Sequence, residues 1–333
     1  MTGLGRFLTV TVGALLLLAA STTYLAATDA TYAVRATVVP YRPDAPFLIT
    51  DARYADKTNF ETRTVEVLQP VADDRALSTR PVIVFVHGGG WVDGYADWYT
   101  QFVTPTLVAA QGFVVVNVDY RLTSDQVFLA ASYPLTLTKA AWYDDNLQDV
   151  AAAIAWTEQN IADYGGDPQN IFLFGHSSGG HLVSLLATHD SYRALRADIR
   201  AVITLSGAYQ LDELNPLIFN PLFDQTFVGG HNDRAALAEA SPASYVRTDD
   251  ALPPFYVLHC QFDLPSLPEQ AIAFRNQLET FGYTVTWEYL AGYSHESEIT
   301  ALADSQEVVT QRIVDYILTH VQKSVYLPLV AAP

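Results

Sequence analysis

The stretch that most constrains the fold is residues 170–188, where an apolar run passes through a glycine-rich turn into a helical pattern. Residues 171–174 form a run typical of a fully buried strand. A strand, a G-x-S-x-G turn and a helix in this order are the context in which the motif marks a nucleophilic serine, here Ser177. Gly175 and Gly179 flank it because the turn leaves no room for a β-carbon. A purely structural glycine turn is the alternative interpretation of this motif alone.

A second glycine-rich turn, HGGGW at residues 87–91, follows another apolar run at residues 82–86. The backbone N–H groups of such a turn are free to point at a ligand. The amide of Ser178 is expected at a helix N-terminus, where a developing anion is favoured. The two turns together therefore predict a nucleophile and the hydrogen-bond donors of an oxyanion hole.

A serine hydroxyl needs a base within hydrogen-bond reach, and the base needs an orienting carboxylate. On a parallel sheet these groups come from loops at the carboxyl ends of strands, here in the order serine, acid, histidine. Asp263 and His295 each follow a late apolar run, so we expect Asp263 to be the acid and His295 the base. The alternatives are a turn-capping role for Asp263 and a helix N-terminal position for His295, with Asp212 and Asp233 as rival acids.

The other histidines within the globular part are expected to be structural. His87 would support the glycine turn, His176 would pack beside the serine turn, and His181 would lie on the following helix. His231 falls in an irregular segment, and His259, at the end of an apolar run, would be a hydrogen-bonded core group. No set of residues has the sequence spacing of metal ligands, so neither a metal nor a cofactor is expected.

The pattern along the chain predicts an α/β domain with a mostly parallel sheet flanked by helices. A helix between the runs at residues 81–87 and 113–118 implies that these two strands are parallel. Residues 91–99 are interpreted as an aromatic loop after the glycine turn. Antiparallel edge strands are predicted at residues 34–39 and 63–67, further strands at 201–205, 255–259 and 284–290, and helices at 102–110, 146–164, 267–281 and 296–321.

Two segments interrupt the alternation of strands and helices. Residues 122–143 are irregular and rich in aromatic side chains, and they would form either a lid over the site or a packed connection. Residues 206–250 contain Pro216, Pro221 and Pro242 and are interpreted as a small helical insertion beside the site. Both are candidates for a small cap.

The ends of the chain have their own patterns. Residues 1–30 are expected to be an export signal, because Arg6 is the only early charge and residues 7–20 are apolar. An uncleaved membrane anchor is the alternative. Residues 31–323 would form the catalytic domain, and the apolar residues 324–333 would dock as a final strand or loop.

The charge balance limits the class of partner. The 333 residues include 36 acidic and 18 basic side chains, which gives a net charge of −18. This argues against a nucleic-acid partner and against binding to an anionic membrane surface. The single cysteine, Cys260, excludes an internal disulfide, and its place in an apolar run predicts a buried, inert thiol.

The motifs in combination resemble those of the α/β-hydrolase superfamily, in particular its hormone-sensitive-lipase-like and feruloyl-esterase-like carboxylesterases. The similarity runs over about residues 64–322. It is carried by His87-Gly88-Gly89-Gly90-Trp91, Asp119-Tyr120-Arg121, Tyr164-Gly165-Gly166-Asp167-Pro168, the serine turn through His181, Asp263 and His295. Two departures are a longer connection after Arg121 and the sequence His259-Cys260-Gln261-Phe262 where a His-Gly turn is common.

The resemblance implies a serine carboxylesterase without a cofactor. It assigns Ser177 as nucleophile, His295 as base and Asp263 as acid. The oxyanion donors that it implies are the amides of Ser178, Gly89, Gly90 and Gly88.

We accordingly expect a secreted enzyme that hydrolyses small-molecule esters with short acyl or aryl groups. The side chains expected to contact substrate are Trp91, His176, Trp98 and Phe223. Two alternatives stay open at this stage: an arylformamidase or other amide hydrolase of the same fold, and a non-catalytic binding module on a hydrolase scaffold. The oligomeric state is not indicated by the sequence.

Overall fold

The computed structural model describes residues 34–40, 64–70, 80–123, 141–248 and 251–322, all within one compact unit that spans Tyr32–Pro333. The predicted export signal at residues 1–30, the tail at 324–333 and most of the possible lid at 122–143 therefore lie outside the described residues. Within the described ranges, no helix combines the length and the apolar composition needed to cross a bilayer.

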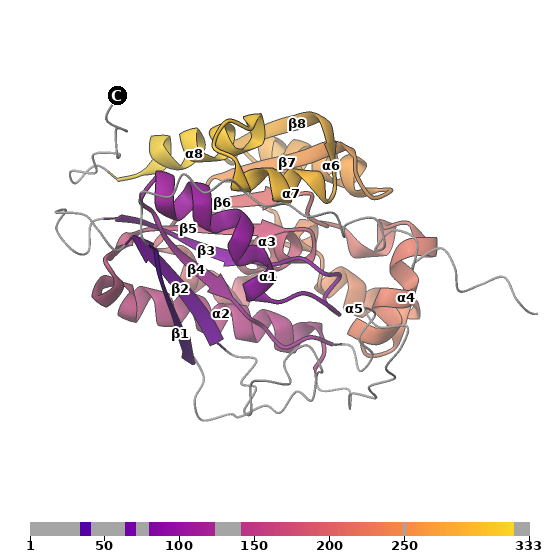
Figure 1. The fold of residues 1–333 in the computed structure, drawn as a ribbon. Helices are drawn as coiled ribbons and strands as arrows, with labels where there is room; N and C mark the ends of the chain where they lie inside the picture. Colours follow the sequence, from indigo (N-terminus) through magenta and orange to yellow (C-terminus); the bar gives the residue numbers. More distant parts are fainter. Residues whose placement is uncertain (1–33, 41–63, 71–79, 124–140, 249–250, 323–333) are drawn as a thin grey trace, which may run out of the picture. The chain divides into compact units, whose positions relative to one another are not determined.

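An eight-stranded sheet forms the centre of the described unit (Figure 1). In spatial order its strands are β1 (Val34–Pro40), β2 (Thr64–Pro70), β4 (Val114–Val118), β3 (Arg80–Val86), β5 (Gly166–His176), β6 (Ile199–Leu205), β7 (Phe255–Phe262) and β8 (Val285–Ser294). All pairs from β4 to β8 are parallel, whereas β1 and β2 are antiparallel to their neighbours. The predicted α/β class with a mostly parallel sheet is confirmed. Only β1 of the two predicted edge strands lies at the edge, because β2 pairs on its other side with β4.

Helices cover both faces of this sheet. They are α1 (Ala96–Val103), α2 (Tyr143–Asn160), α3 (Ser178–Thr188), α4 (Pro216–Thr226), α5 (Arg234–Glu239), α6 (Leu267–Thr280), α7 (Ser297–Thr300) and α8 (Val308–His320). Side chains alternate along each parallel strand, so Val84 packs toward α2, α3 and α6 while Phe85 packs toward α1 and α8. Burial on both faces explains why the central strands are nearly continuous apolar runs.

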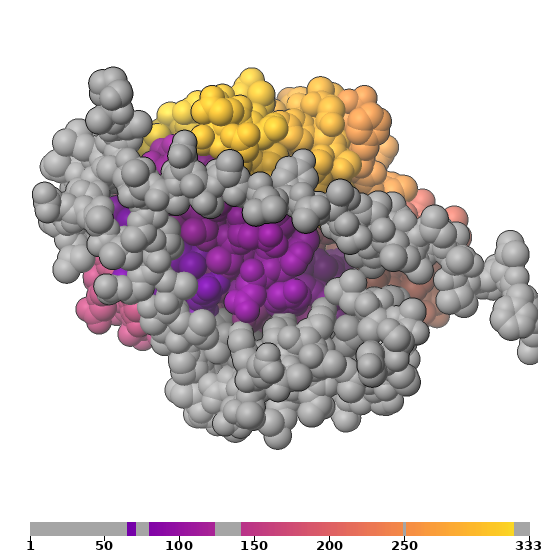
Figure 2. All heavy atoms as spheres, viewed as in Figure 1, coloured from indigo at the N-terminus to yellow at the C-terminus, as the bar shows by residue number. Residues whose placement is uncertain are grey.

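Two of the predicted helices, at residues 102–110 and 296–321, differ from the prediction in where they begin or in their continuity. The first begins earlier, at Ala96, where the backbone N–H donates to the Asp119 carboxylate across 2.7 Å. It continues as a π-helical segment, Thr104–Ala110, beginning next to Pro105, which has no N–H to donate to the preceding turn. The second breaks into α7, a short 3-10 turn and α8. α1 lies against this 3-10 turn, Ala301–Ala303, and Figure 2 shows purple atoms of the region around α1 reaching the surface below the yellow atoms of α8.

The insertion at residues 206–250 is helical, as predicted, with α4, α5 and three short 3-10 turns. A β-carbon added to Gly90 would lie 3.0 Å from Cδ1 of Leu222, which places α4 directly against the glycine turn. The insertion therefore lies beside the predicted site, as the proline-rich pattern suggested.

Candidate active site

The serine turn has the strained geometry that its sequence predicts. Ser177 joins β5 to α3 with φ 54° and ψ −120°, and its N–H donates to the carbonyl of Leu205 across 2.9 Å. A β-carbon on Gly175 would lie 2.3 Å from the carbonyl oxygen of Gly179, and one on Gly179 would lie 2.0 Å from that of Val86. Both glycines are thus required by close backbone approach, and Ser177 pays a conformational cost that this packing maintains.

The predicted acid and base lie side by side because β7 and β8 are parallel neighbours. Asp263 directly follows β7, and His295 directly follows β8, since both strands run three or four residues beyond the apolar runs. Nδ1 of His295 lies 2.7 Å from Oδ1 of Asp263, and Nε2 lies 2.9 Å from Oγ of Ser177. Three residues that are far apart in sequence therefore form one continuous hydrogen-bonded chain.

The hydrogen bonds assign the proton positions in this chain. Nδ1–H of His295 donates to the Asp263 carboxylate, so Nε2 carries the lone pair and accepts from the Ser177 hydroxyl. Burial opposes charge on His295, but the hydrogen bond and charge of Asp263 outweigh it and raise its pKa above 6.5, with help from Glu298 and Glu296. The imidazole is therefore a stronger base than a free histidine.

Asp263 accepts hydrogen bonds from three groups. Its side chain is fully buried, which opposes ionisation. Hydrogen bonds from His295, from the hydroxyl of Ser206 (2.6 Å) and from the N–H of Leu264 (2.8 Å) nevertheless lower the pKa of the carboxyl group. It can therefore stay ionised beside the imidazole.

The two rival acids are engaged elsewhere. Asp233 caps α5 by accepting from the N–H of Ala236 across 3.0 Å. Asp212 accepts from the side chain of Gln210 and lies 3.7 Å from Arg234. Neither is part of the hydrogen-bonded chain of His295.

The glycine turn lies against the serine turn. A β-carbon on Gly88 would lie 3.0 Å from Cβ of Ser177, so the two turns are in near contact. Gly89 and Gly90 have φ of 126° and 61°, in the region that glycine tolerates best. Within the described part of the chain, the N–H groups of these two glycines donate to no other group. Ser178 is the first residue of α3, so its N–H lies at the helix N-terminus.

Three of the four side chains expected to contact substrate are buried behind the two turns. Trp91, His176 and Phe223 are only 1–2% exposed. The indole N–H of Trp91 donates to Nδ1 of His181 across 3.0 Å, and its ring packs near Phe223. These side chains pack behind the two turns and expose almost no surface, and their direct contact with substrate stays a prediction. Trp98 is partly exposed and stays a candidate.

Two of the structural assignments for histidines are confirmed, and one is wrong. His87 donates from Nδ1 to the carbonyl of Gly88 and stacks on Tyr120, so it supports the glycine turn. His181 uses both ring nitrogens, with Nε2 donating to Ala240. His259, however, is 3% exposed, and neither nitrogen has a hydrogen-bond partner among the described residues. Its ring packs against the rings of Trp287 and Tyr289, which fill the space around it but form no hydrogen bond with its nitrogens.

Sequence reasoning missed two polar groups behind the site, Ser206 and Glu298. Ser206 follows a predicted strand end, which was its only signal. Glu298 lies three residues after His295 in what reads as a solvated helix, yet its side chain is fully buried. His176, His295 and Glu298 place possible metal-ligand atoms within 4.8 Å of one another. A cation there would have to displace hydrogen bonds that both histidines already make.

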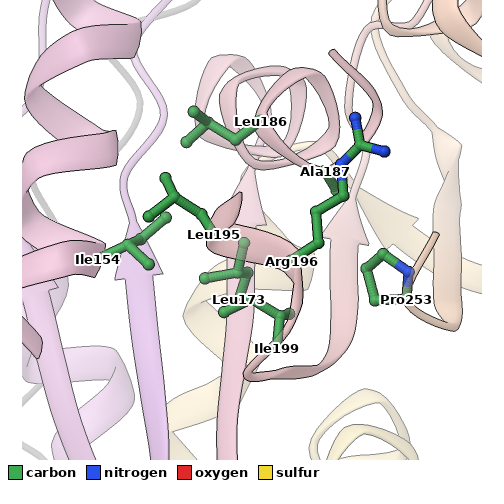
Figure 3. A pocket seen from close by; sticks show the side chains of 8 residues that line it. All are labelled: Ile154, Leu173, Leu186, Ala187, Leu195, Arg196, Ile199 and Pro253. Atoms are coloured by element: carbon green, nitrogen blue, oxygen red, sulfur yellow. The ribbon is translucent and has the colours of Figure 1, made fainter. Parts of the chain in front are cut away.

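Figure 3 shows a small apolar hollow between α2, α3 and the start of β6. It is lined by Ile154, Leu173, Leu186, Ala187, Leu195, Arg196, Ile199 and Pro253. Ile199 begins β6 and Ala187 is near the end of α3, so the hollow is at the far end of these elements from the serine turn. Arg196 donates to the carbonyls of Thr188 and His189 and thereby caps α3. We assign the hollow to packing.

A family model called BD-FAE matches residues 71–278 of the chain. Among curated proteins, esterase LipQ of Mycobacterium tuberculosis is 29% identical over 251 residues, covering 71% of this chain and 55% of the relative. Isoprenylcysteine alpha-carbonyl methylesterase ICME of Arabidopsis thaliana is 25% identical, covering 65% of this chain and 50% of the relative. The chain thus spans about half the length of the curated relatives that it matches.

Solved esterase structures show the same fold. A thermostable esterase from Pseudomonas putida superposes with a TM-score of 0.63 at 19% identity, covering 88% of this chain and 84% of that one. A truncated carbohydrate esterase from gut microbiota superposes with a TM-score of 0.60 at 17% identity, covering 88% and 98%. At these identities the likeness establishes the architecture.

Proposed function

Because the chain belongs to the BD-FAE family and has the α/β-hydrolase fold, we propose that it is a serine carboxylesterase. The observation that carries the proposal is the hydrogen-bonded chain from Ser177 through His295 to Asp263, with bonds of 2.9 and 2.7 Å. This is the arrangement that activates a serine hydroxyl for attack on a carbonyl carbon.

In the first half-reaction, Oγ of Ser177 bonds to the ester carbonyl carbon while its proton passes to Nε2 of His295. The carbonyl π-electrons move to oxygen and form a tetrahedral oxyanion. This collapses as the C–O bond to the alcohol breaks, and His295 returns the proton to the departing alkoxide. Asp263 stabilises the transient imidazolium through Nδ1–H. Water, activated by the same imidazole, then releases the acyl group as a carboxylic acid.

The oxyanion would be held by backbone N–H groups. We assign the donors to Ser178, at the N-terminus of α3, and to Gly89 and Gly90. The two glycine N–H groups bond to no other described residue, which leaves them available for a substrate oxygen. Gly88 contributes chiefly by allowing the two turns to approach, since a side chain there would strike His176 and Ser177.

The substrate class proposed is a small-molecule ester with a short acyl or aryl group. Leu222 of the insertion packs over Gly90 and narrows the space beside the proposed oxyanion donors. Such a contact favours a short acyl chain over a long one. Residues 1–30 would direct export of the enzyme, and the mass of the mature N-terminus would test this part of the proposal.

A substrate panel tests the reaction. The wild type and Ser177→Ala would be compared on p-nitrophenyl acetate, butyrate and octanoate, on an ester of an aromatic acid and on N-formylkynurenine. We expect the acetate or butyrate ester to give the highest kcat/KM, and Ser177→Ala to lose about 10³-fold or more. Preference for the formamide would instead identify an amide hydrolase. No turnover by the wild type on any substrate would support a non-catalytic binding module.

A further inference from the structure

Glu298 is a buried carboxylate directly behind the proposed catalytic histidine. It lies in α7, and its side chain is fully buried. By distance and angle neither carboxylate oxygen has a hydrogen-bond partner among the described residues, with the weakly polar thiol of Cys260 as a nearby donor besides His176, and no lysine or arginine of the described residues forms an ion pair with it. An unpaired buried carboxylate is costly to keep, so its position calls for a physical reason.

The nearest groups to Glu298 are two histidines. Oε1 lies 3.6 Å from Nε2 of His176, and a carboxylate oxygen comes within 4.8 Å of a ring nitrogen of His295. Nε2 of His176 is also 3.0 Å from the carbonyl oxygen of His295, so it must carry a proton and donate to that carbonyl. Glu298 thus faces the donor that fixes the backbone of His295.

We propose that Glu298 is a positioning residue whose negative charge stabilises the imidazolium formed when His295 accepts the proton of Ser177. The inference rests on the proposed function and extends it, because it assigns a second carboxylate besides Asp263 to the same histidine. Asp263 acts through a hydrogen bond to Nδ1, whereas Glu298 acts through space and through His176.

His295 gains a positive charge at a position where water is scarce. The residue is only 8% exposed, so solvent contributes little to stabilising a cation there. A carboxylate in the same buried region interacts with that cation with little screening. The interaction is stronger when the imidazole is protonated than when it is neutral, and this difference is what accelerates a reaction. It also raises the pKa of His295, in the same direction as Asp263 does.

Other titratable groups around this cluster do not cancel the charge of Glu298. From β7, Cys260 faces it, and burial followed by the carboxylate charge raises the pKa of that thiol. Tyr209, which follows β6, has a pKa raised by burial and, to a smaller degree, by Asp263 and Glu298. From α1, the ring of Tyr99 lies 6.2 Å from that of His176. The neutral forms of the thiol and both phenols add no positive charge.

The chain offers a matched control in Glu296. It lies one residue after His295 and is exposed to solvent, while Glu298 is buried. Both carboxylates act on His295 in the same direction. Because water screens an exposed charge, replacing Glu296 with glutamine should change the titration of His295 much less.

The test is the pH dependence of kcat/KM for p-nitrophenyl butyrate with the full-length protein. For Glu298→Gln, which keeps the side-chain shape, we expect the acidic limb to move about one unit lower and kcat to fall about tenfold, with KM nearly unchanged. Glu298→Asp keeps the charge but moves it away from His295, so its acidic limb should move in the same direction by less than that of Glu298→Gln. An unmoved limb in Glu298→Gln, whatever happens to kcat, would contradict the proposal and leave Glu298 a packing residue.

A second readout does not depend on turnover. NMR titration of the His295 ring, assigned with His295→Gln, should show a lower midpoint in Glu298→Gln than in the wild type and in Glu296→Gln. If the wild type hydrolyses no ester but the midpoint shifts, the proposed function fails and the electrostatic inference stands. If esters are hydrolysed and the midpoint does not shift, only the inference about Glu298 fails. If Glu298→Gln does not fold, the His295 ring is titrated in Glu298→Asp instead. Because this variant moves the carboxylate away, the midpoint of His295 should lie below that of the wild type. An identical midpoint would refute the inference.

Discussion

The hydroxyl of Ser206 donates to Oδ2 of Asp263 across 2.6 Å, from a residue whose backbone has φ 48° directly after β6. The N–H of Ser206 meanwhile donates to Leu258 across 2.9 Å. Asp263 uses its other oxygen for His295 and Leu264, so the carboxylate is held from both sides. The orientation of the proposed acid therefore depends on a residue from a third strand.

Replacing Ser206 with alanine should lower kcat about three- to thirtyfold with little change in KM, because Asp263 loses one hydrogen bond that fixes it. Stability should fall by about 1–2 kcal/mol. Ser206→Gly removes the same hydroxyl but tolerates the positive φ, so it should lose as much kcat and less stability than the alanine variant. Steady-state kinetics and urea unfolding measure both effects. Wild-type kcat in Ser206→Ala would contradict this role.

The acidic limb of activity should report the raised pKa of His295. The base must be neutral, so kcat/KM should fall as pH decreases through a midpoint above 6.5. The effect on stability has the opposite direction. The folded state binds the His295 proton more tightly than the unfolded state does. The contribution of protonated His295 to the free energy of unfolding is therefore fully present below about pH 6.5, and it is lost as pH rises through the pKa of His295 in the folded protein.

Asp263→Asn separates these effects, because it removes the charge that raises the pKa of His295. The acidic limb should move to lower pH, and kcat should fall by about 10⁴-fold as the imidazole loses its required tautomer. Rate profiles and urea unfolding of both proteins between pH 5 and 9 provide the measurements. A limb at the same pH in both proteins would show that Asp263 does not set this titration.

Leu222 should limit the length of the acyl group. Its side chain packs over Gly90, next to the proposed oxyanion donors. Leu222→Ala should raise the ratio of kcat/KM for octanoate to that for acetate by about tenfold, since several methylenes gain space. Leu217 lies on the same helix but is 88% exposed, so Leu217→Ala should leave this ratio unchanged. Equal ratios in the two variants would place the acyl group elsewhere.

Asp149 should be important for stability. Its fully buried carboxylate accepts from Nε and Nη2 of Arg121, at 2.7 and 2.9 Å, and from the backbone N–H of the same arginine. Asp149→Ala should destabilise the fold by about 3 kcal/mol, because the buried guanidinium loses this partner and keeps the Asp145 carboxylate, 3.0 Å from Nη1. The partly exposed pair of Arg275 and Glu279 is the control, with Glu279→Ala costing about 0–1 kcal/mol. Urea unfolding compares them, and similar losses would refute the distinction.

The parts of the site that local sequence could predict are those set by neighbouring residues. The serine turn needs Gly175 and Gly179 because the backbone itself approaches there, and this requirement is visible as a motif. Asp263 and His295 were predicted because parallel strands bring the residues after their carboxyl ends together. The structure shows this pairing directly at β7 and β8.

The parts that could not be predicted depend on contacts between distant elements. Glu298 has the spacing of a solvated helical residue, yet its carboxylate is buried beside His176 of β5 and Cys260 of β7. Ser206 becomes significant only when β6 lies beside β7. His259 was expected to have polar partners, but its neighbours on β8 are Trp287 and Tyr289. Burial of a polar side chain is a tertiary property that a local pattern does not contain.

Covalent labelling with a fluorophosphonate reports directly whether Ser177 is an activated nucleophile. Intact mass spectrometry followed by peptide mapping would locate the adduct on the full-length protein. We expect one phosphonate per chain, on the peptide that contains Ser177, with no labelling of Ser177→Ala and slow labelling of His295→Ala. A folded wild-type protein that remains unlabelled, or that is labelled at another residue, would contradict the assignment of Ser177 as an activated nucleophile.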